Sequence, residues 1–365
     1  MFPSRYIGLM SGTSLDGVDA ALVAFTDADH CRLEGHHYQA FSNELRERLL
    51  SLNSAGDNEI ERSQMLANQL SKLYADCTRT LLHQSGLVPA DIAAIGSHGQ
   101  TVRHRPDLGF TVQIGNAALL AELTGITVVA DFRSRDVAAG GQGAPLVPAF
   151  HQAAFGHPAH HRVIVNIGGI SNLSDLPIDG QVGGFDCGPG NLLMDAWMYR
   201  HTGHSYDRDG AWANEGTVIP KLLHAMKAHP FLALPPPKST GRDTFNMAWL
   251  DMLLLPSYDP ADVQATLLEY AAVCIADSID TYCCGATEIY LCGGGVHNRA
   301  LMARLGTLLP DRTLALTDTL GIGADWVEAA AFAWLARQTL FNQPGNLPGV
   351  TGAAGTRILG AVYPA

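Results

Sequence analysis

One stretch near the N-terminus constrains the fold more than any other. An apolar run from Tyr6 to Met10 leads into a segment of glycine, hydroxyl and carboxyl residues, and a second apolar run from Val18 to Phe25 leads out of it. This pattern predicts two strands joined by a tight turn that contains glycine. Because glycine has no Cβ, the backbone N–H groups of such a turn can approach a polyanion closely. An ordinary polar hairpin turn explains the same pattern, so the turn alone leaves both interpretations open.

Two carboxylates, Asp16 and Asp19, belong to the same turn. Their negative charge opposes the binding of bare phosphate. It suits a phosphate that binds together with a divalent cation, since magnesium is commonly held by one or two carboxylates and by phosphate oxygens. The turn therefore fits a metal–phosphate ligand better than phosphate alone.

Length, composition and charge exclude several classes of protein. A chain of 365 residues suggests about two domains, and 47% hydrophobic with 16% charged residues predicts folded domains with large cores. The net charge of −12 argues against non-specific binding to nucleic acid or to anionic membranes. No apolar run is long enough to span a membrane, and the N-terminus does not resemble a signal peptide, so neither is expected.

The cysteines, histidines and lysines narrow the choice further. The seven cysteines form no Cys-x-x-Cys pair, which indicates neither a zinc site nor a disulfide framework and favours a reducing cytoplasm. The histidines at positions 151, 157, 160 and 161 are predicted to lie on the solvated surface. No Gly-Lys dipeptide occurs, which excludes a Walker-type phosphate loop.

The first half reads as alternating helices and strands. Helices are predicted over residues 43–52, 59–85 and 116–123, and strands over residues 91–96, 110–114 and 126–130. Polar residues follow two of these strands, in the segments 97–101 and 131–133. Ligand contacts in α/β sheets lie at such strand ends, although a plain polar loop is an equal alternative. We place the domain boundary in the glycine-rich region that follows, which gives one domain of residues 1–135 and 345–365 and a second of residues 136–344.

The second half opens with a similar pattern, because residues 163–173 again read as strand, glycine turn and strand. Asp186 then lies among glycines, just before a helix predicted over residues 192–201. A carboxylate held there can serve as a general base beside a phosphate site, or simply as a turn or cap residue. Apolar residues at helical spacing predict a longer helix over residues 261–283. Glu328 lies near the start of a helix predicted over residues 325–340, where an acid ordinarily complements the helix dipole. Lys238 and Arg242 lie in a proline-rich loop, and their spacing favours solvated surface charges over a lid.

Together these stretches resemble the superfamily of sugar kinases, Hsp70 and actin. The resemblance implies two related α/β domains with an ATP cleft between them, a phosphate-binding hairpin in each domain and a glycine-rich adenosine loop. The residues that match these three nucleotide-binding parts are Gly12, Thr13, Ser14, Leu15, Asp16, Gly17, Val18 and Asp19, then Gly168, Gly169 and Asn172, then Gly293, Gly294, Gly295 and Asn298.

Within that superfamily the chain is similar to one family, the anhydro-N-acetylmuramic acid kinases. The motifs that carry the similarity extend over nearly the whole chain. They are Gly8-Leu9-Met10-Ser11-Gly12-Thr13-Ser14-Leu15-Asp16-Gly17-Val18-Asp19, Gly96-Ser97-His98-Gly99-Gln100-Thr101, Val129-Ala130-Asp131-Phe132-Arg133, Gly184-Phe185-Asp186-Cys187-Gly188-Pro189-Gly190-Asn191, Pro237-Lys238-Ser239-Thr240-Gly241-Arg242 and Leu291-Cys292-Gly293-Gly294-Gly295. Asp243 stands where glutamate is commoner in the family, which is a conservative departure.

The resemblance implies an ATP-dependent reaction in the recycling of the bacterial cell wall. Water opens the 1,6-anhydro ring of 1,6-anhydro-N-acetylmuramic acid, and O6 is phosphorylated to give N-acetylmuramic acid 6-phosphate. Asp186 matches the catalytic base, and Asp16 is the expected Mg²⁺ ligand. The residues expected to hold the sugar are Ser97, His98, Gln100, Asp131, Arg133 and Glu328. The resemblance also implies a cytoplasmic homodimer with no nucleic-acid or membrane partner.

Two other functions are compatible with the same motifs. An ordinary hexose or amino-sugar kinase of the superfamily would phosphorylate a free hydroxyl and hydrolyse nothing. A nucleotide-dependent switch of the Hsp70 or actin type would bind protein partners instead. The chain has no separate peptide-binding domain and no obvious insert for polymerisation, which argues against the switch.

Overall fold

The computed structural model describes residues 4–12, 15–26 and 31–365, which form two compact units. The first unit comprises Met1–Phe155 and Gly321–Ala365, and the second comprises Gly156–Leu320. These boundaries differ from the predicted ones, which fell at residues 135 and 345. The reason is packing: helices α5 (Val147–Phe155) and α11 (Val327–Leu340) contact each other, and α11 covers strands of the first unit. Glu328 therefore belongs to the first unit.

The first unit contains a six-stranded sheet and a separate two-stranded ribbon. Its strands are β1 (Ser4–Met10), β2 (Gly17–Phe25), β3 (Cys31–Ala40), β4 (Ile92–Ser97), β5 (Gln100–Arg105), β6 (Phe110–Ile114), β7 (Val128–Ala130) and β13 (Ala361–Tyr363). Its other helices are α1 (Asn43–Leu50), α2 (Glu59–Ser85), α3 (Ala117–Thr124), α4 (Ser134–Ala138) and α12 (Pro348–Thr351).

The second unit contains a five-stranded sheet. Its strands are β8 (Arg162–Ile167), β9 (Ile170–Leu176), β10 (Gly183–Pro189), β11 (Glu288–Cys292) and β12 (Thr313–Leu316). Its helices are α6 (Leu192–Thr202), α7 (Pro220–Lys227), α8 (Met247–Asp251), α9 (Pro260–Tyr282) and α10 (Arg299–Leu308). The long helix α9, predicted from its apolar spacing, is buried along most of its length.

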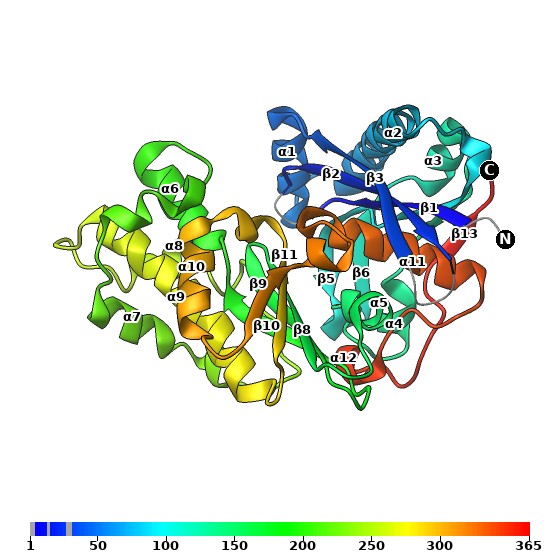
Figure 1. The fold of residues 1–365 in the computed structure, drawn as a ribbon. Coiled ribbons are helices and arrows are strands. Elements are labelled where there is room, and N and C mark those ends of the chain that lie inside the picture. The colour runs from blue at the N-terminus through cyan, green and yellow to red at the C-terminus, as the bar shows by residue number, and fades with distance from the viewer. Residues whose placement is uncertain (1–3, 13–14, 27–30) are drawn as a thin grey trace. The chain divides into compact units, whose positions relative to one another are not determined.

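Five strands of the first sheet, in the order β7-β4-β1-β2-β3, have the same arrangement as β12-β11-β8-β9-β10 in the second. Figure 1 shows the strands and helices of each unit. In the first, β1, β2 and β3 form an antiparallel meander, and β4 and β7 continue the sheet beside β1 as parallel strands. In the second, β8, β9 and β10 form the meander, and β11 and β12 continue it beside β8 in the same way. This repetition confirms the predicted fold class of two related α/β domains.

Several strands were not predicted. The exposed outer strand β3 alternates imperfectly, and β5 with β6 forms a ribbon apart from the main sheet, so the segment 110–114 is a strand but not a sheet member. At the other end of the chain, β13 pairs with β7, which confirms that the C-terminal tail packs on the first domain. The glycine-rich segment around Asp186 is the strand β10, which was not predicted.

Helix ends follow local chemistry. The side chain of Asn116 accepts a hydrogen bond from Leu119 N and so caps the start of α3. Gly125 ends that helix with φ 65°, and Gly86 ends α2 with φ 66°. Both glycines adopt the left-handed conformation at a helix C-terminus, which residues with a Cβ adopt at a cost.

Helix α11 lies directly on the first sheet because two glycines clear its path. Gly8 of β1 and Gly96 of β4 are partners in the parallel register, so they form one flat patch. A Cβ on Gly8 would lie 1.7 Å from Ala329 O, and a Cβ on Gly96 would lie 1.9 Å from Phe332 O. The helix also carries alanines at 329, 330, 331 and 333, all of them buried. This close contact fixes the start of α11, and with it Glu328.

One prediction about the histidines was wrong. His151 is 2% exposed on α5, where burial lowers the pKa of its imidazole to about 3. His161 is partly buried and its Nε2 lies 2.5 Å from Asp175 Oδ1.

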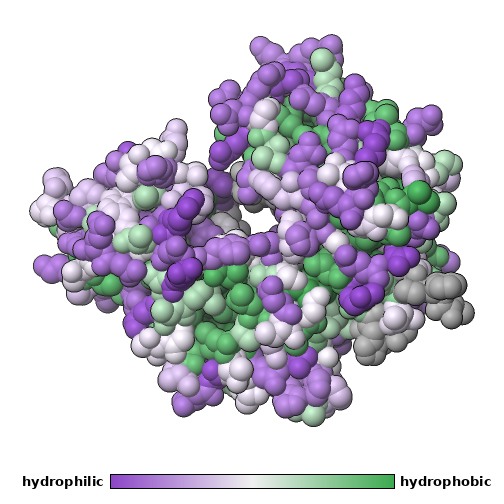
Figure 2. All heavy atoms as spheres, turned by 45° about the horizontal axis from the view of Figure 1, so that its top comes forward, coloured by the Kyte–Doolittle hydropathy of each residue, from purple (hydrophilic) through white to green (hydrophobic). Residues whose placement is uncertain are grey.

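Hydrophilic residues dominate the face drawn in Figure 2, with hydrophobic residues in patches between them. None of the described helices is both long and apolar enough to span a bilayer.

Candidate active site

The predicted sugar-binding residues of the first unit gather at one edge of its sheet. The parallel strands β1, β4 and β7 end side by side, with Leu9 paired to Ser97 and Ser97 paired to Ala130. His98 and Asp131 follow directly, and His98 N donates a hydrogen bond to Leu9 O at 3.0 Å. Ser97 and His98 are buried, whereas Asp131 is exposed with φ 60°. Because the carboxyl ends of parallel strands form the ligand edge of α/β sheets, this placement agrees with a ligand site.

Arg133 interacts with two of the predicted sugar-binding residues, His98 and Glu328, and with the carbonyl group of Gly143. Its Nε and Nη2 lie 3.1 and 3.0 Å from His98 Nε2, and its Nη1 donates to Gly143 O at 2.7 Å. Burial and the neighbouring guanidinium lower the pKa of His98 to about 3, so this imidazole is neutral at physiological pH. Burial raises the pKa of Glu328, and the positive charge of Arg133 partly offsets that rise. The structure thus brings His98, Arg133 and Glu328 together.

Gln100, which was expected to contact the sugar, also contacts the turn between β1 and β2. Its Nε2 donates to Gly12 O at 3.0 Å and so ties β5 to the turn between β1 and β2. Its Oε1 is buried and has no hydrogen-bond partner among the described residues. Ser11 strengthens the same turn, with its Oγ 2.7 Å from Tyr74 OH and 3.1 Å from Gly99 O.

The predicted phosphate hairpin has the expected strands. Gly12 and Leu15 lie in the turn, Leu15 with φ 57°, and Gly17, Val18 and Asp19 begin β2. Thr13 and Ser14, which the resemblance assigned to nucleotide binding, lie outside the described residues. The turn is held from the opposite side by Tyr38, whose hydroxyl donates to Asp16 O at 2.9 Å.

Carboxylates concentrate beside this hairpin. Burial raises the pKa of Asp19 to about 7, and the negative charges of Asp16, Glu328 and Asp325 add to the rise. The described residues contain no group of three or more side chains close enough to enclose a metal ion by themselves. The arrangement suits a cation that completes its coordination with phosphate oxygens and water, as magnesium does.

Replacing Asp19 with asparagine is expected to stabilise the ligand-free protein at pH 8 but not near pH 4. Between its ordinary pKa near 4 and the raised pKa of about 7, this carboxyl is ionised in the unfolded chain and takes up a proton on folding. The free energy of unfolding therefore falls as pH rises through that window. The expected gain at pH 8 is about 2 kcal/mol, because the side chain remains partly solvated. Urea unfolding in EDTA across this pH range measures it.

Asp57→Asn is the matched control, because Asp57 is an exposed carboxyl of the same unit. Its substitution should leave the free energy of unfolding unchanged at both pH values. A gain from Asp19→Asn that is equal at pH 4 and pH 8 would contradict the predicted linkage.

In the second unit, Asp186 belongs to a row of polar residues across the sheet. Asn166 of β8 pairs with Asn172 of β9, and Asn172 pairs with Asp186 of β10. Directly opposite residues in a sheet point to the same face, so these three side chains share one face at one level. The register shifts between Asp186 and Gly188, which marks a bulge immediately after the carboxylate.

The surroundings of Asp186 differ from the predicted helix entrance. Asp186 lies inside β10, whereas α6 begins at Leu192. The first N–H groups of that helix region are already used, since Gly190, Asn191 and Leu192 donate to the carbonyls of Gly168 and Gly169. The turn glycines 168 and 169 therefore hold α6 in place, and the start of α6 does not offer these N–H groups to an anion.

One oxygen of Asp186 is fully held. Ser239 Oγ and Thr240 N both donate to its Oδ2, at 2.9 and 2.8 Å, whereas no described residue hydrogen-bonds its Oδ1. Burial raises the pKa of Asp186, and these two donors together with the charge of Lys238 partly counter the rise. A carboxylate with one oxygen fixed and the other available can accept a proton from a group beside it.

The predicted adenosine loop lies at the same end of the sheet. It follows β11, whose last residue, Cys292, pairs with Asn166. Gly293 has φ 82°, and a Cβ there would lie 2.1 Å from Asn166 Oδ1. The last residue of the loop has a structural task, since Asn298 Oδ1 accepts from Leu301 N and caps α10. Gly293 is thus required to be glycine by a close approach as well as by its conformation.

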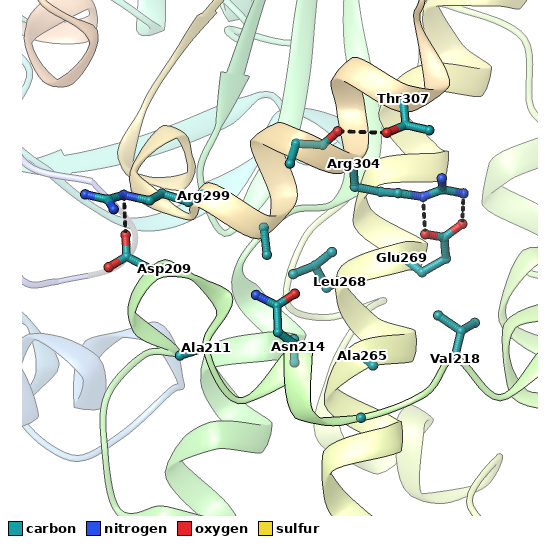
Figure 3. A pocket seen from close by; sticks show the side chains of 14 residues that line it. Asp209, Ala211, Asn214, Val218, Ala265, Leu268, Glu269, Arg299, Arg304 and Thr307 are labelled. Atoms are coloured by element: carbon teal, nitrogen blue, oxygen red, sulfur yellow. Dashed lines mark hydrogen bonds and ion pairs between the residues drawn. The ribbon is translucent and has the colours of Figure 1, made fainter.

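A cavity of about 670 Å³ opens beside this loop (Figure 3). Its walls are α10, α9 and the segment 209–218, and many lining residues are small, with alanines at 211, 213, 265, 300 and 303. Two ion pairs lie at its rim: Arg299 Nε is 3.2 Å from Asp209 Oδ1, and Arg304 binds both carboxylate oxygens of Glu269 at 2.6 and 2.7 Å. A Cβ on Gly210 would lie 2.6 Å from Asn298 Oδ1, so the cavity wall contacts the loop directly.

Comparison with known proteins agrees with this geometry. The family model described as anhydro-N-acetylmuramic acid kinase matches residues 4–365. The chain belongs to this family. Among curated relatives with that name, the protein of Nitrosomonas europaea is 56% identical over 362 residues, which is 99% of each chain. The protein of Nitrosospira multiformis is 56% identical over 100% of each chain, and that of Pseudomonas putida is 55% identical over 99% of each.

Membership in the anhydro-N-acetylmuramic acid kinase family makes this protein a kinase. The structure adds residues whose role the sequence did not reveal. Lys238 is 9% exposed, so the interpretation as a solvated surface charge was wrong. Ser239 and Thr240 contact Asp186 although the sequence places them more than fifty residues away. Only the family motif around residues 237–242 marked this loop, because spacing alone shows no link to β10.

Proposed function

We propose that the protein is an ATP-dependent kinase that opens the 1,6-anhydro ring of 1,6-anhydro-N-acetylmuramic acid with water and phosphorylates O6. The observation that carries this proposal is Asp186, whose Oδ2 is fixed by Ser239 and Thr240 while Oδ1 has no described partner. A plain kinase needs to activate only a sugar hydroxyl. Hydrolytic opening needs a base for water, and Asp186 supplies one in a chain of this family.

In the proposed reaction, Asp186 Oδ1 accepts a proton from water as the water oxygen forms a bond to the anomeric carbon. The bond between that carbon and O6 breaks, and its electron pair stays on O6. O6 then bonds to the γ-phosphorus of ATP, and ADP leaves. The catalytic contribution of the protein is positioning and charge stabilisation, which dominate phosphoryl transfer generally.

Arg133 and Glu328 are proposed to bind the sugar together with Ser97, His98, Gln100 and Asp131. A neutral His98 can exchange hydrogen bonds with sugar hydroxyls, and the buried Oε1 of Gln100 is an acceptor without a protein partner among the described residues. The positive charge of Arg133 also offsets part of the rise that burial causes in the pKa of Glu328. These are the side-chain types that orient a polar substrate by paired hydrogen bonds.

The nucleotide is proposed to bind through both glycine turns. Within the first unit, the turn of residues 12–19 is the proposed contact for phosphate. Within the second unit, Gly293, Gly294, Gly295 and Asn298, beside the cavity of Figure 3, are the proposed contacts for the nucleoside. Asp16 and Asp19 would hold Mg²⁺, and the raised pKa of Asp19 among like charges fits a cation in this place. When bound, Mg²⁺ neutralises the phosphate charge. The protein is also proposed to form a homodimer. Light scattering tests this proposal by measuring the molar mass in solution.

The decisive experiment uses the purified protein with ATP, Mg²⁺ and the 1,6-anhydro sugar in ¹⁸O-labelled water. Mass spectrometry and NMR then locate the label and the phosphate. We expect a 6-phosphate with ¹⁸O on the anomeric carbon. A phosphorylated sugar with an intact anhydro ring would support a plain kinase instead. ATP cleavage without any sugar product would support a nucleotide switch.

A further inference from the structure

Lys238 occupies an unusual place for a lysine. Only 9% of it is exposed, and its Nζ lies 4.9 Å from the centre of the Phe231 ring, 5.7 Å from that of Tyr282 and 5.9 Å from that of Phe185. Its Nζ donates a hydrogen bond to a backbone carbonyl, Leu232 O, at 3.2 Å. A desolvated ammonium among aromatic faces is held by cation–π attraction. This aromatic cage, made of Phe185, Phe231 and Tyr282, fixes the lysine head.

The backbone of the same lysine is bound to the strand that carries Asp186. Asp186 N donates to Lys238 O at 3.0 Å, and the next two residues return two donors to Asp186 Oδ2. The turn of residues 238–240 thus contacts Asp186 at its backbone and at its carboxylate. The cage shares Phe185, the neighbour of Asp186 in β10, so the head and the backbone of Lys238 are anchored to the same strand.

We propose that Lys238 is a positioning residue for Asp186: its caged ammonium fixes the 238–240 turn, which holds Oδ2 and aims Oδ1 at the water. This inference rests on the proposed function, because it assigns Lys238 a role in activating the base. Lys238 does not touch the substrate in this role. Its head is enclosed by three rings and bonded to Leu232 O, so it is not extended towards a phosphate.

The charges around this pair support an electrostatic part of the role. The ionisable groups that face Lys238 are Asp186, Cys187, Cys274 and the phenol of Tyr282 in the cage, and Cys187 also faces Asp186. Burial raises the pKa of both thiols, that of Cys187 to about 12, so they are neutral at working pH. Asp186 is the one carboxyl among these groups, and the positive charge of Lys238 lowers its pKa against the effect of burial. Loss of the lysine charge should raise the pKa of Asp186, and the acid limb of the rate profile should move to higher pH.

The test compares the full-length wild type with Lys238→Met, Lys238→Arg and Ser239→Ala. Methionine keeps the length and apolar stem of lysine but removes the charge, and arginine restores the charge over aromatic rings. We expect Lys238→Met to lower kcat about 10- to 100-fold, with KM for sugar and ATP nearly unchanged, and to shift the acid limb upward. Lys238→Arg should recover much of kcat, and Ser239→Ala should lower it less. Lys221→Met, at an exposed lysine of α7, is the control.

A second readout does not depend on turnover. NMR titration of ¹³C-labelled aspartate, with the Asp186 signal identified by its loss in Asp186→Asn, follows the carboxyl directly. An upward shift of its pKa in Lys238→Met supports the role of Lys238 even if the wild type fails to label the sugar, in which case only the proposed function falls. An active wild type with an unshifted Asp186 signal in Lys238→Met overturns this inference alone. So does a fall in kcat that Lys238→Arg does not reverse.

Discussion

Asp186→Asn is expected to lower turnover by about 10²–10⁴-fold, the contribution of one well-placed general base. The substitution should leave the fold intact, because asparagine has the same shape and its carbonyl oxygen can accept the hydrogen bonds that Ser239 Oγ and Thr240 N now donate to Oδ2. Only the capacity to take a proton is lost. The measurement is kcat for sugar phosphorylation, with Kd for ATP and for the sugar measured by calorimetry and expected to be nearly unchanged.

Asp179→Asn is the matched control, since Asp179 is an exposed aspartate near the turn between β9 and β10 and contacts only local backbone. It should retain full activity and the same melting temperature. Near-normal turnover in Asp186→Asn would contradict the assignment of the base. Loss of both activity and melting temperature would instead assign Asp186 a structural role.

Local patterns in the sequence predicted most of the strands and helices, since the hairpin, α2 and α9 depend on neighbouring residues alone. The apolar runs on either side of the turn and the helical spacing in 59–85 and 261–283 contain that information. The sequence did not predict the strand β10, because its glycines are typical of a turn, whereas pairing with β9 holds the segment extended. The predicted domain boundaries differ from the observed ones for a similar reason. Residues 321–344 belong to the first unit because α11 packs on β1 and β4, and local sequence patterns do not show this packing.

The candidate site shows the same division. Family motifs indicated Asp186 and Arg133, and the position after a strand indicated ligand contacts in the segments 97–101 and 131–133, which contain His98 and Arg133. The bond from Gln100 to Gly12 O and the enclosure of Lys238 depend on contacts between distant segments, which composition and spacing do not contain. A lysine in a proline-rich loop is ordinarily solvated, and only tertiary packing reveals an exception.

Gly8→Ala is expected to be the most destabilising alanine substitution among the described glycines whose surroundings are known, because its Cβ would have the shortest contact. Its Cβ would lie 1.7 Å from Ala329 O, 2.7 Å from Ala333 N and 2.8 Å from Ala329 C, and all three are backbone atoms that no rotamer change can move. Helix α11 would have to leave the sheet. We expect a loss of at least about 3 kcal/mol, beyond the usual range for overpacking, or failure to fold. Urea unfolding and soluble yield measure the effect.

Gly96→Ala tests the same contact from the neighbouring strand, where the Cβ would lie 1.9 Å from Phe332 O. Gly306→Ala is the opposite case, because nothing lies within 4 Å of its Cβ and it is exposed near the end of α10. That change should be neutral or stabilise by up to ~1 kcal/mol, as alanine replaces glycine in a helix. An unchanged melting temperature in both Gly8→Ala and Gly96→Ala would show that α11 does not rest on this patch.

Any active protein recovered from Gly96→Ala carries a further consequence for the site. Glu328 begins the helix that must move, and its electrostatic partner Arg133 is held independently by His98 and Gly143. Separation of the two would leave KM for the sugar raised while ATP cleavage in the absence of sugar stays unchanged. A rise in KM for ATP with an unaltered KM for the sugar would place Glu328 on the nucleotide instead. The glycine pair thus couples the packing of the first domain to the geometry of its candidate sugar site.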